Sequence, residues 1–197
     1  MTKPRLFIHA CCAPCACYPV ELLRGEYDIT LFFYNPNIYP EEEFNKRLEE
    51  IKLFCRRTWP SSPTNHLIVG EYDSRHWFEL VKGLENEPER GRRCDICYEM
   101  RLRKTAQQAK ADSYDYFGTD LSVSPHKKAD KINELGRQLE KEFSIKYFEA
   151  DFKKKDGFKK SLEISHQHNF YRQNYCGCVF SRAGREVKKC QHTTTIS

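Results

Sequence analysis

Residues 5–15, RLFIHACCAPC, join a short apolar segment to three closely spaced cysteines. The apolar part, RLFIHA at 5–10, predicts a strand, and ITLFFY at 29–34 predicts a second strand of nearly continuous apolar character. Uninterrupted apolar runs of this kind are typical of strands buried on both faces of a parallel sheet. The segment therefore predicts a first strand that ends at two adjacent thiols, Cys11 and Cys12.

Strand and helix signals alternate along the rest of the chain. Further strands are expected at 66–70, 114–121 and 145–150, and helices at 19–25, 41–55, 74–84, 95–111, 132–143 and 158–168. Such alternation predicts an α/β fold, with one open, mostly parallel sheet of about five strands, flanking helices and right-handed crossovers.

The length and composition suit one domain. The chain has 197 residues, of which 39% are hydrophobic and 13% aromatic. We expect a single α/β domain over 1–190 with a cysteine-rich redox site, and a disordered tail over 191–197. No run approaches the ~20 apolar residues that a membrane helix needs. The basic and then apolar start is too short for a secretory signal and contains His9, so a cytoplasmic location is expected.

The number and grouping of the cysteines indicate metal binding or redox chemistry. Ten cysteines are many for a reducing compartment, where disulfide scaffolds are rare. Seven of them fall into three tight groups, which are Cys11, Cys12 and Cys15, then Cys94 and Cys97, and finally Cys176 and Cys178.

The first two groups are expected to meet. The carboxyl ends of parallel strands form the edge at which such sheets bind ligands, which places Cys11, Cys12 and residues 35–37 and 118–120 on one rim. Cys94 and Cys97 are spaced i, i+3, so one helical turn presents both sulfurs on the same face. The two pairs together give four thiolates, for which structural zinc and an iron–sulfur cluster are the candidates.

The adjacency of Cys11 and Cys12 favours the cluster. Neighbouring side chains of an extended chain point apart, and two splayed sulfurs suit separate iron corners of a cubane better than two vertices of one zinc tetrahedron. The other interpretations stay open: structural zinc, a thioredoxin-like dithiol at Cys94 and Cys97, or buried thiols that act as small hydrophobes. Cys15 lies close enough in sequence to compete as a ligand.

Cys176 and Cys178 enclose a single glycine. A disulfide across one residue closes a very small ring, and strained disulfides are labile and oxidising, so we interpret this pair as a two-electron redox switch. Free thiols or further metal ligands are the alternatives. Of the other cysteines, Cys55 lies on the apolar face of its helix and is expected in the core, while Cys17 and Cys190 have no evident partner.

Several polar segments indicate an RNA partner. SPHKK at 124–128 and KKKDGFKKS at 153–161 are basic, and Tyr171, Arg172 and Tyr175 interleave aromatic and cationic side chains, as in single-stranded RNA binders. The net charge of +5 is compatible with nucleic acid without proving it. The candidates for acid–base, ligand or phosphate-contact roles are His126, Asp95, Asp120, Arg90, Arg92 and Arg93.

A series of segments resembles the QueH-type epoxyqueuosine reductase family: HACCAPC, FFYNPNIYPEEEF, RCDICYEMRLRKTA, SPHKKADKINELG and FKKKDGFKKSLEIS…YRQNYCGCVFS. They follow in order over nearly the whole chain. The resemblance implies the adenine-nucleotide α-hydrolase-like (HUP) fold. Cysteines stand where ATP-using relatives of that fold carry a glycine-rich phosphate loop, so ATP hydrolysis is not expected.

The resemblance also implies an activity and its residues. The reaction would reduce the epoxide of epoxyqueuosine, at the wobble position of certain transfer RNAs, to give queuosine. Cys11, Cys12, Cys94 and Cys97 would bind a [4Fe–4S] cluster, and Cys176 with Cys178 would form a redox-active disulfide. A second, mononuclear iron beside the cluster is left open. A carboxylate ligand for it would be expected near the first motif, where this chain has Cys15 after Ala13 and Pro14.

The expected reaction removes the epoxide oxygen as water, with two electrons from an unidentified donor and two protons. Two alternatives of other classes stay open. One is a zinc-stabilised RNA-binding module without catalysis, and the other is a thiol–disulfide oxidoreductase that acts on proteins. The identity of the bound metal separates them.

Overall fold

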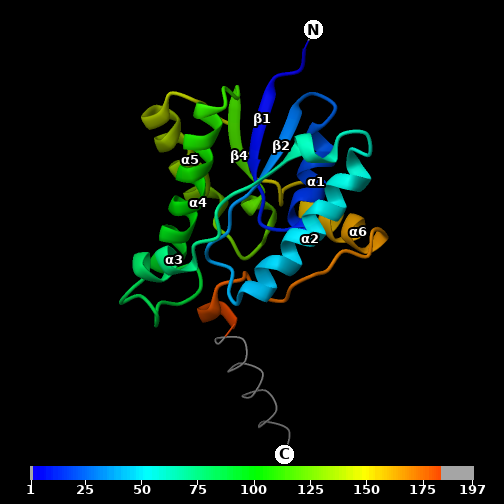
Figure 1. Ribbon diagram of the computed structural model, residues 1–197. Coiled ribbons are helices and arrows are strands. Elements are labelled where there is room, and N and C mark those ends of the chain that lie inside the picture. Colours follow the sequence, from blue (N-terminus) through cyan, green and yellow to red (C-terminus); the bar gives the residue numbers. More distant parts are fainter. Residues whose placement is uncertain (1, 183–197) are drawn as a thin grey trace, which may run out of the picture.

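The structure is a computed structural model that describes residues 2–182 (Figure 1). Five parallel strands form one open sheet in the order β3-β2-β1-β4-β5. The strands are β1 (Arg5–His9), β2 (Asp28–Phe33), β3 (Leu67–Val69), β4 (Tyr116–Thr119) and β5 (Lys146–Tyr147). The predicted α/β class and five-stranded parallel sheet are confirmed.

Helices cover both faces of the sheet (Figure 1). The helix α1 (Ala13–Leu23) packs on one face with α2 (Glu41–Thr58) and α6 (Gly157–Gln167), and α4 (Arg92–Ala111) packs on the other with α5 (Ala129–Phe143). The remaining helical elements are α3 (Ser74–Leu80) and the short 3-10 turns η1 (Pro63–His66) and η2 (Leu121–Val123).

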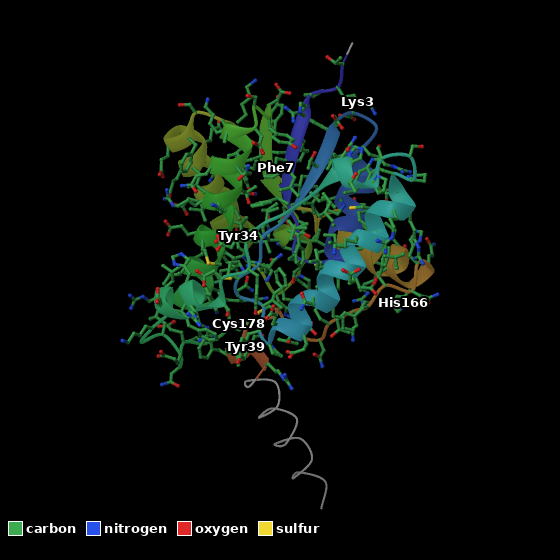
Figure 2. All side chains as sticks on the ribbon, in the orientation of Figure 1. Lys3, Phe7, Tyr34, Tyr39, His166 and Cys178 are labelled. Atoms are coloured by element: carbon green, nitrogen blue, oxygen red, sulfur yellow. The ribbon has the colours of Figure 1, made fainter. Side chains whose placement is uncertain are left out.

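The fold has two hydrophobic cores, one on each face of the sheet, and the alternation of side chains along the strands explains both. Side chains alternate between the faces of a strand, so Phe7 of β1 contributes to the core under α4 and α5, while Leu6 and Ile8 contribute to the core under α1 and α2. Both faces are apolar, which is why the strands read as continuous apolar runs. In Figure 2, Phe7 lies within the body of the fold, and Cys178 and Tyr39 lie together at the end opposite Lys3.

The first helix begins earlier than predicted. We expected it at Pro19, but α1 starts at Ala13 with Pro14 in its first turn. A proline is accepted there because the first amides of a helix have no intrahelical acceptor, so Pro14 opens the helix and does not break it. Cys15 and Cys17 therefore lie on a helix that begins directly after the adjacent thiols.

The other elements lie where they were predicted, but some of their boundaries differ. The strand β5 covers two of the six residues expected at 145–150, and α4 begins three residues early, so that Cys94 lies in its first turn. The predicted tail at 191–197 and Cys190 lie outside the described residues. None of the helices in residues 2–182 is both long and apolar enough to cross a membrane.

Candidate metal centre

Three cysteine sulfurs meet where β1 passes into α1. Cys11 and Cys12 follow the strand, Cys15 lies in the first turn of the helix, and their sulfur atoms all lie within 4.8 Å of one another. The sulfurs of Cys11 and Cys12 are 3.7 Å apart. Among residues 2–182, no other set of three or more possible ligands is grouped so closely. The helix start thus adds Cys15 to the predicted pair.

The neighbouring strand supplies a buried carboxyl group to the same site. Asp120 follows β4, which pairs directly with β1, and its two oxygens accept from the Cys11 amide at 3.0 and 3.2 Å. Burial, together with the negative charge of Cys12, raises the pKa of Asp120 to about 8. The prediction that Cys11, Cys12 and Asp120 share the carboxyl rim is confirmed.

Cys12 is the thiol of the group that ionises most readily. Hydrogen bonds from Cys11 and Cys15 lower its pKa well below the usual value, although burial opposes this, and the charge of Arg47 adds to the effect. The Gln173 amide also donates to the Cys12 sulfur at 2.9 Å. The hydrogen bond between Cys11 and Cys12 has the opposite effect on Cys11 and raises the pKa of its thiol. Without metal, the group therefore carries its first negative charge at Cys12.

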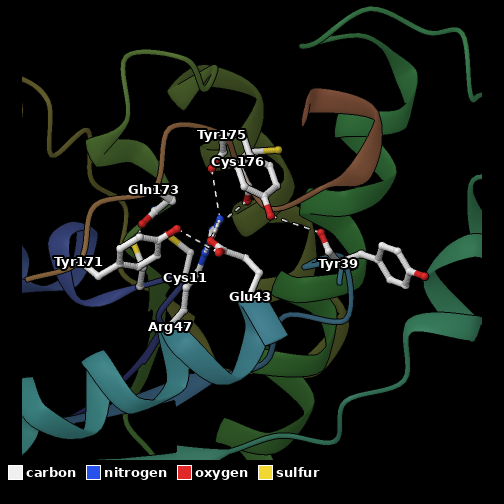
Figure 3. Close-up of polar contacts among 9 residues, drawn as sticks. Cys11, Tyr39, Glu43, Arg47, Tyr171, Gln173, Tyr175 and Cys176 are labelled. Atoms are coloured by element: carbon white, nitrogen blue, oxygen red, sulfur yellow. Dashed lines mark hydrogen bonds and ion pairs between the residues drawn. The ribbon is translucent and has the colours of Figure 1, made fainter. Parts of the chain in front are cut away.

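The buried Arg47 holds the dithiol segment, residues 171–178 with Cys176 and Cys178, against this rim (Figure 3). Arg47 of α2 donates to the carbonyl oxygens of Cys176 at 3.2 Å and Tyr175 at 3.3 Å, and pairs with Glu43 at 2.7 Å. The hydroxyl group of Tyr171 donates to the other oxygen of Glu43 at 3.0 Å. Residues 171–178 are thus held across the N-terminal end of α2, and Gln173 of this segment contacts the Cys12 sulfur.

Sequence reasoning missed Arg47, although a signal for it existed. Phe44, Arg47 and Ile51 lie at i, i+3 and i+7 of one helix, so a charged residue occupies a position on the apolar face. The guanidinium group is 1% exposed. A charge is buried in this way only when it is paired and hydrogen-bonded, so the pattern indicated a polar partner inside the fold.

The second cysteine group surrounds a small cavity of about 20 Å³. Cys94 and Cys97 of α4 line it together with Cys176 and Cys178, and the buried Trp77 forms part of its wall. Cys178 is buried and Cys176 is partly buried, and no disulfide joins the two in the described chain. The hydrogen bond from Cys178 holds the pKa of Cys176 well below its usual value despite burial, and the charge of Lys127 contributes.

A larger cavity of about 170 Å³ adjoins the small one and reaches the first cysteine group. Cys11 and Cys15 line the larger cavity, and Cys176 lines both. The six cysteines predicted as site residues also belong to or pack against one core cluster, on the α4 face of the sheet. The structure therefore brings the three distant groups to one region, with Cys176 between the other two.

The cysteine groups are surrounded by buried positive charge. Arg101 of α4 donates to the Cys97 carbonyl at 3.1 Å. Burial alone would lower the pKa of its guanidinium group, but the Cys97, Cys11 and Cys176 thiolates raise it above the usual value. Such compensation is what a buried set of several thiolates needs.

The other polar candidates have mostly structural contacts. Arg93 is buried and donates to the carbonyl oxygens of Leu84, Glu85 and Glu87, so it stabilises a turn and does not present its charge to solvent. Asp95 pairs with Lys131 on α5. The remaining cysteines with described positions, Cys17 and Cys55, are buried in the core on the opposite face of the sheet, which confirms the core prediction for Cys55.

Comparisons with known proteins show the family to which this chain is similar. The family model described as "Epoxyqueuosine reductase QueH" matches residues 6–184. The chain is 40% identical to a protein of that name from Staphylococcus epidermidis over 182 residues, covering 91% of this chain and 76% of the relative. A relative of the same name from Streptococcus pyogenes is 39% identical over 180 residues, with 91% and 71% covered. A third, from Thermotoga maritima, is 34% identical over 193 residues, with 94% of each covered. The chain therefore belongs to the epoxyqueuosine reductase QueH family, a family of oxidoreductases.

Proposed function

We propose that this protein reduces epoxyqueuosine, at the wobble position of transfer RNA in the cytoplasm, to queuosine, the final step of queuosine biosynthesis. The family membership supports the substrate and the reaction. The observation that carries the proposal is the meeting of three cysteine groups beside a cavity on the carboxyl rim of the sheet. Reductive chemistry needs redox groups beside a space for the substrate, and this rim is where α/β sheets bind ligands.

The residues fit an iron–sulfur cluster. Cys11, Cys12, Cys94 and Cys97 would hold a [4Fe–4S] cluster, because thiolates are the ligands that such clusters require. The indole N–H group of Trp77 is buried beside Cys94 and Cys97 without an acceptor within residues 2–182, and a sulfide would be one. A bound cluster supplies electrons one at a time. Cys15 is the third thiol of its group and would be available to a second, mononuclear iron.

The Cys176–Cys178 dithiol completes the electron balance. Reduction of the epoxide breaks two C–O bonds, forms an alkene and releases water, which takes two electrons and two protons. Oxidation of two thiols to one disulfide releases two electrons and two protons, so the two half-reactions balance. Cys176 would ionise first, because its pKa is lowered, while Cys178 keeps its proton. A reductant from outside the protein would then restore the dithiol.

Anaerobic purification followed by metal analysis and a substrate assay tests this proposal. We expect iron and acid-labile sulfide in the protein, and loss of the epoxide from transfer RNA that carries epoxyqueuosine under reducing conditions. A colourless protein that contains only zinc would favour the RNA-binding module. Activity on protein disulfides that survives metal removal would favour the thiol–disulfide oxidoreductase. Iron-loaded, reduced protein that leaves the epoxide unchanged would refute the assignment.

A matched pair of variants links the metal to these cysteines. Cys97→Ala removes a proposed ligand, and Cys55→Ala removes a thiol that is also buried but lies in the opposite core. We expect the first variant to lose iron and activity and the second to keep both. Equal loss in both variants would indicate that damage to the core, and not loss of a ligand, is being measured.

A further inference from the structure

The two cavities at the cysteine groups share one wall. Glu89, His126, Lys127 and Cys176 line both of them. The side chains of Glu89 and His126 are exposed to solvent, whereas Lys127 is half-buried. Lys127 is thus the cation positioned between the α4 cysteines and the space that reaches Cys11 and Cys15.

The backbone at Lys127 is held in place from several sides. Its amide donates to the carbonyl oxygen of Ser124 at 3.1 Å. Its own carbonyl oxygen accepts from Lys153 at 3.4 Å. Arg90 donates to the two preceding carbonyl oxygens, at 2.6 Å for Pro125 and 3.1 Å for His126. The Lys127 side chain therefore extends from a fixed backbone, and a group that contacts a substrate needs such fixed placement.

The Lys127 ammonium faces thiols and an aromatic ring. Its nitrogen lies 5.9 Å from the centre of the Tyr98 ring, and within residues 2–182 it forms no ion pair with a carboxylate. Burial lowers its pKa, but the negative charges of Cys176, Tyr98 and Cys11 together outweigh burial and raise the pKa above the usual value. Lys127 thus stays charged at neutral pH, and no carboxylate of the described chain neutralises it.

We propose that Lys127 is a catalytic residue, whose ammonium donates a hydrogen bond to the epoxide oxygen of a nucleoside seated in the larger cavity. This rests on the proposed function. As the C–O bonds break, negative charge develops on the oxygen, and a fixed donor in a partly enclosed site stabilises that charge more in the transition state than in the bound substrate. The oxygen leaves as water with two protons and two electrons from the Cys176–Cys178 dithiol. Lys127 begins and ends protonated.

Kinetics of Lys127→Met and Lys127→Arg test this role, with Lys141→Met as a control that removes an exposed charge at the far end of α5. We expect kcat of Lys127→Met to fall by about 100-fold or more, with KM within about threefold and with the iron content unchanged. Lys127→Arg retains a donor and should recover part of kcat. The control should match the wild type.

A second measurement separates this role from an indirect one. Lys127 also lowers the pKa of Cys176, so its loss could act only by protonating that thiol. If so, raising the pH would restore wild-type kcat in Lys127→Met, in step with the alkylation rate of Cys176, and the proposal would be overturned. A deficit in kcat that persists at pH values where Cys176 is fully ionised supports direct contact.

The remaining outcomes are equally clear. Wild-type kcat in Lys127→Met, or a loss of iron that accounts for its lower activity, overturns the role of Lys127 and leaves the proposed function standing. Iron-loaded wild-type protein without activity on epoxyqueuosine overturns the proposed function itself.

Discussion

The guanidinium group of Arg47 lies 3.2 Å from the carbonyl oxygen of Cys176, a residue 129 positions later in the chain. This contact joins α2 to the dithiol segment, and the same guanidinium charge lowers the pKa of Cys12. One buried side chain thus orients the proposed two-electron donor and stabilises a thiolate of the first cysteine group.

Removing the Arg47 charge should destabilise the fold. Arg47→Met leaves the nearly buried Glu43 carboxylate without its cation, and breaking a buried ion pair in this way costs about 3 kcal/mol or more. The free energy of unfolding in urea measures the effect. In Arg47→Met/Glu43→Gln no uncompensated charge is left, so the double variant should be more stable than the single one. A single variant as stable as the wild type would show that the Arg47–Glu43 ion pair does not stabilise the fold.

Gly177 should be difficult to replace. Its backbone φ of +105° is one that residues with a side chain rarely adopt, and an added Cβ would lie 2.7 Å from Ile38 Cγ1. Gly177→Ala is therefore expected to lower the free energy of unfolding by more than about 1 kcal/mol and to speed alkylation of the buried Cys178. Gly25→Ala, where a Cβ meets nothing within 4 Å, is the control. The expectation fails if the two variants unfold alike.

Cys176 should react with alkylating agents at a pH where ordinary thiols do not. Its pKa is lowered, so the thiolate persists as the pH falls below the usual value near 9 and is lost only at the depressed pKa. Cys178→Ala removes the hydrogen bond that contributes most, and should move the midpoint of the rate–pH curve upward. Mass spectrometry of metal-free protein after timed iodoacetamide treatment gives that curve. An unchanged midpoint would show that Cys178 does not stabilise the thiolate.

Asp120 should make the metal-free protein less stable as the pH rises. Its pKa is about 8 in the fold, raised from 3.8, so the folded state holds a proton that the unfolded state has lost across that interval. This proton stabilises the folded state in full below pH 3.8, and the stabilisation is lost as the pH rises towards about 8. Asp120→Asn keeps an acceptor for the Cys11 amide and should weaken this dependence. Urea midpoints at several pH values measure it, and identical curves for both proteins would argue against a raised pKa.

The fold was largely predictable because its signals are local. Continuous apolar runs such as residues 29–34 marked strands buried on both faces, and the i, i+3 spacing marked Cys94 and Cys97 as one helical face. The start of α1 was missed because a proline in a first turn and a proline in a loop look alike in a sequence. Only the backbone geometry distinguishes them.

The site was less predictable because it depends on contacts between distant segments. Nothing local to Arg47 names Cys176 as its partner, and nothing local to Lys127 shows that it lines two cavities. The cysteines themselves were found because their residue type carries the chemistry. The side chains that orient them come from ordinary helical and loop sequences, and only packing reveals their role.

The most direct test of the central claim is the iron and sulfide content of anaerobically purified variants of each cysteine group. If Cys12 after β1 and Cys97 on α4 hold one shared cluster, the wild type should contain about four sulfides and about four irons or more, and Cys12→Ser and Cys97→Ser should each lose the cluster iron and its sulfide together. Cys17→Ser, in the opposite core, should retain them. A full complement of iron and sulfide in Cys97→Ser would contradict the shared centre.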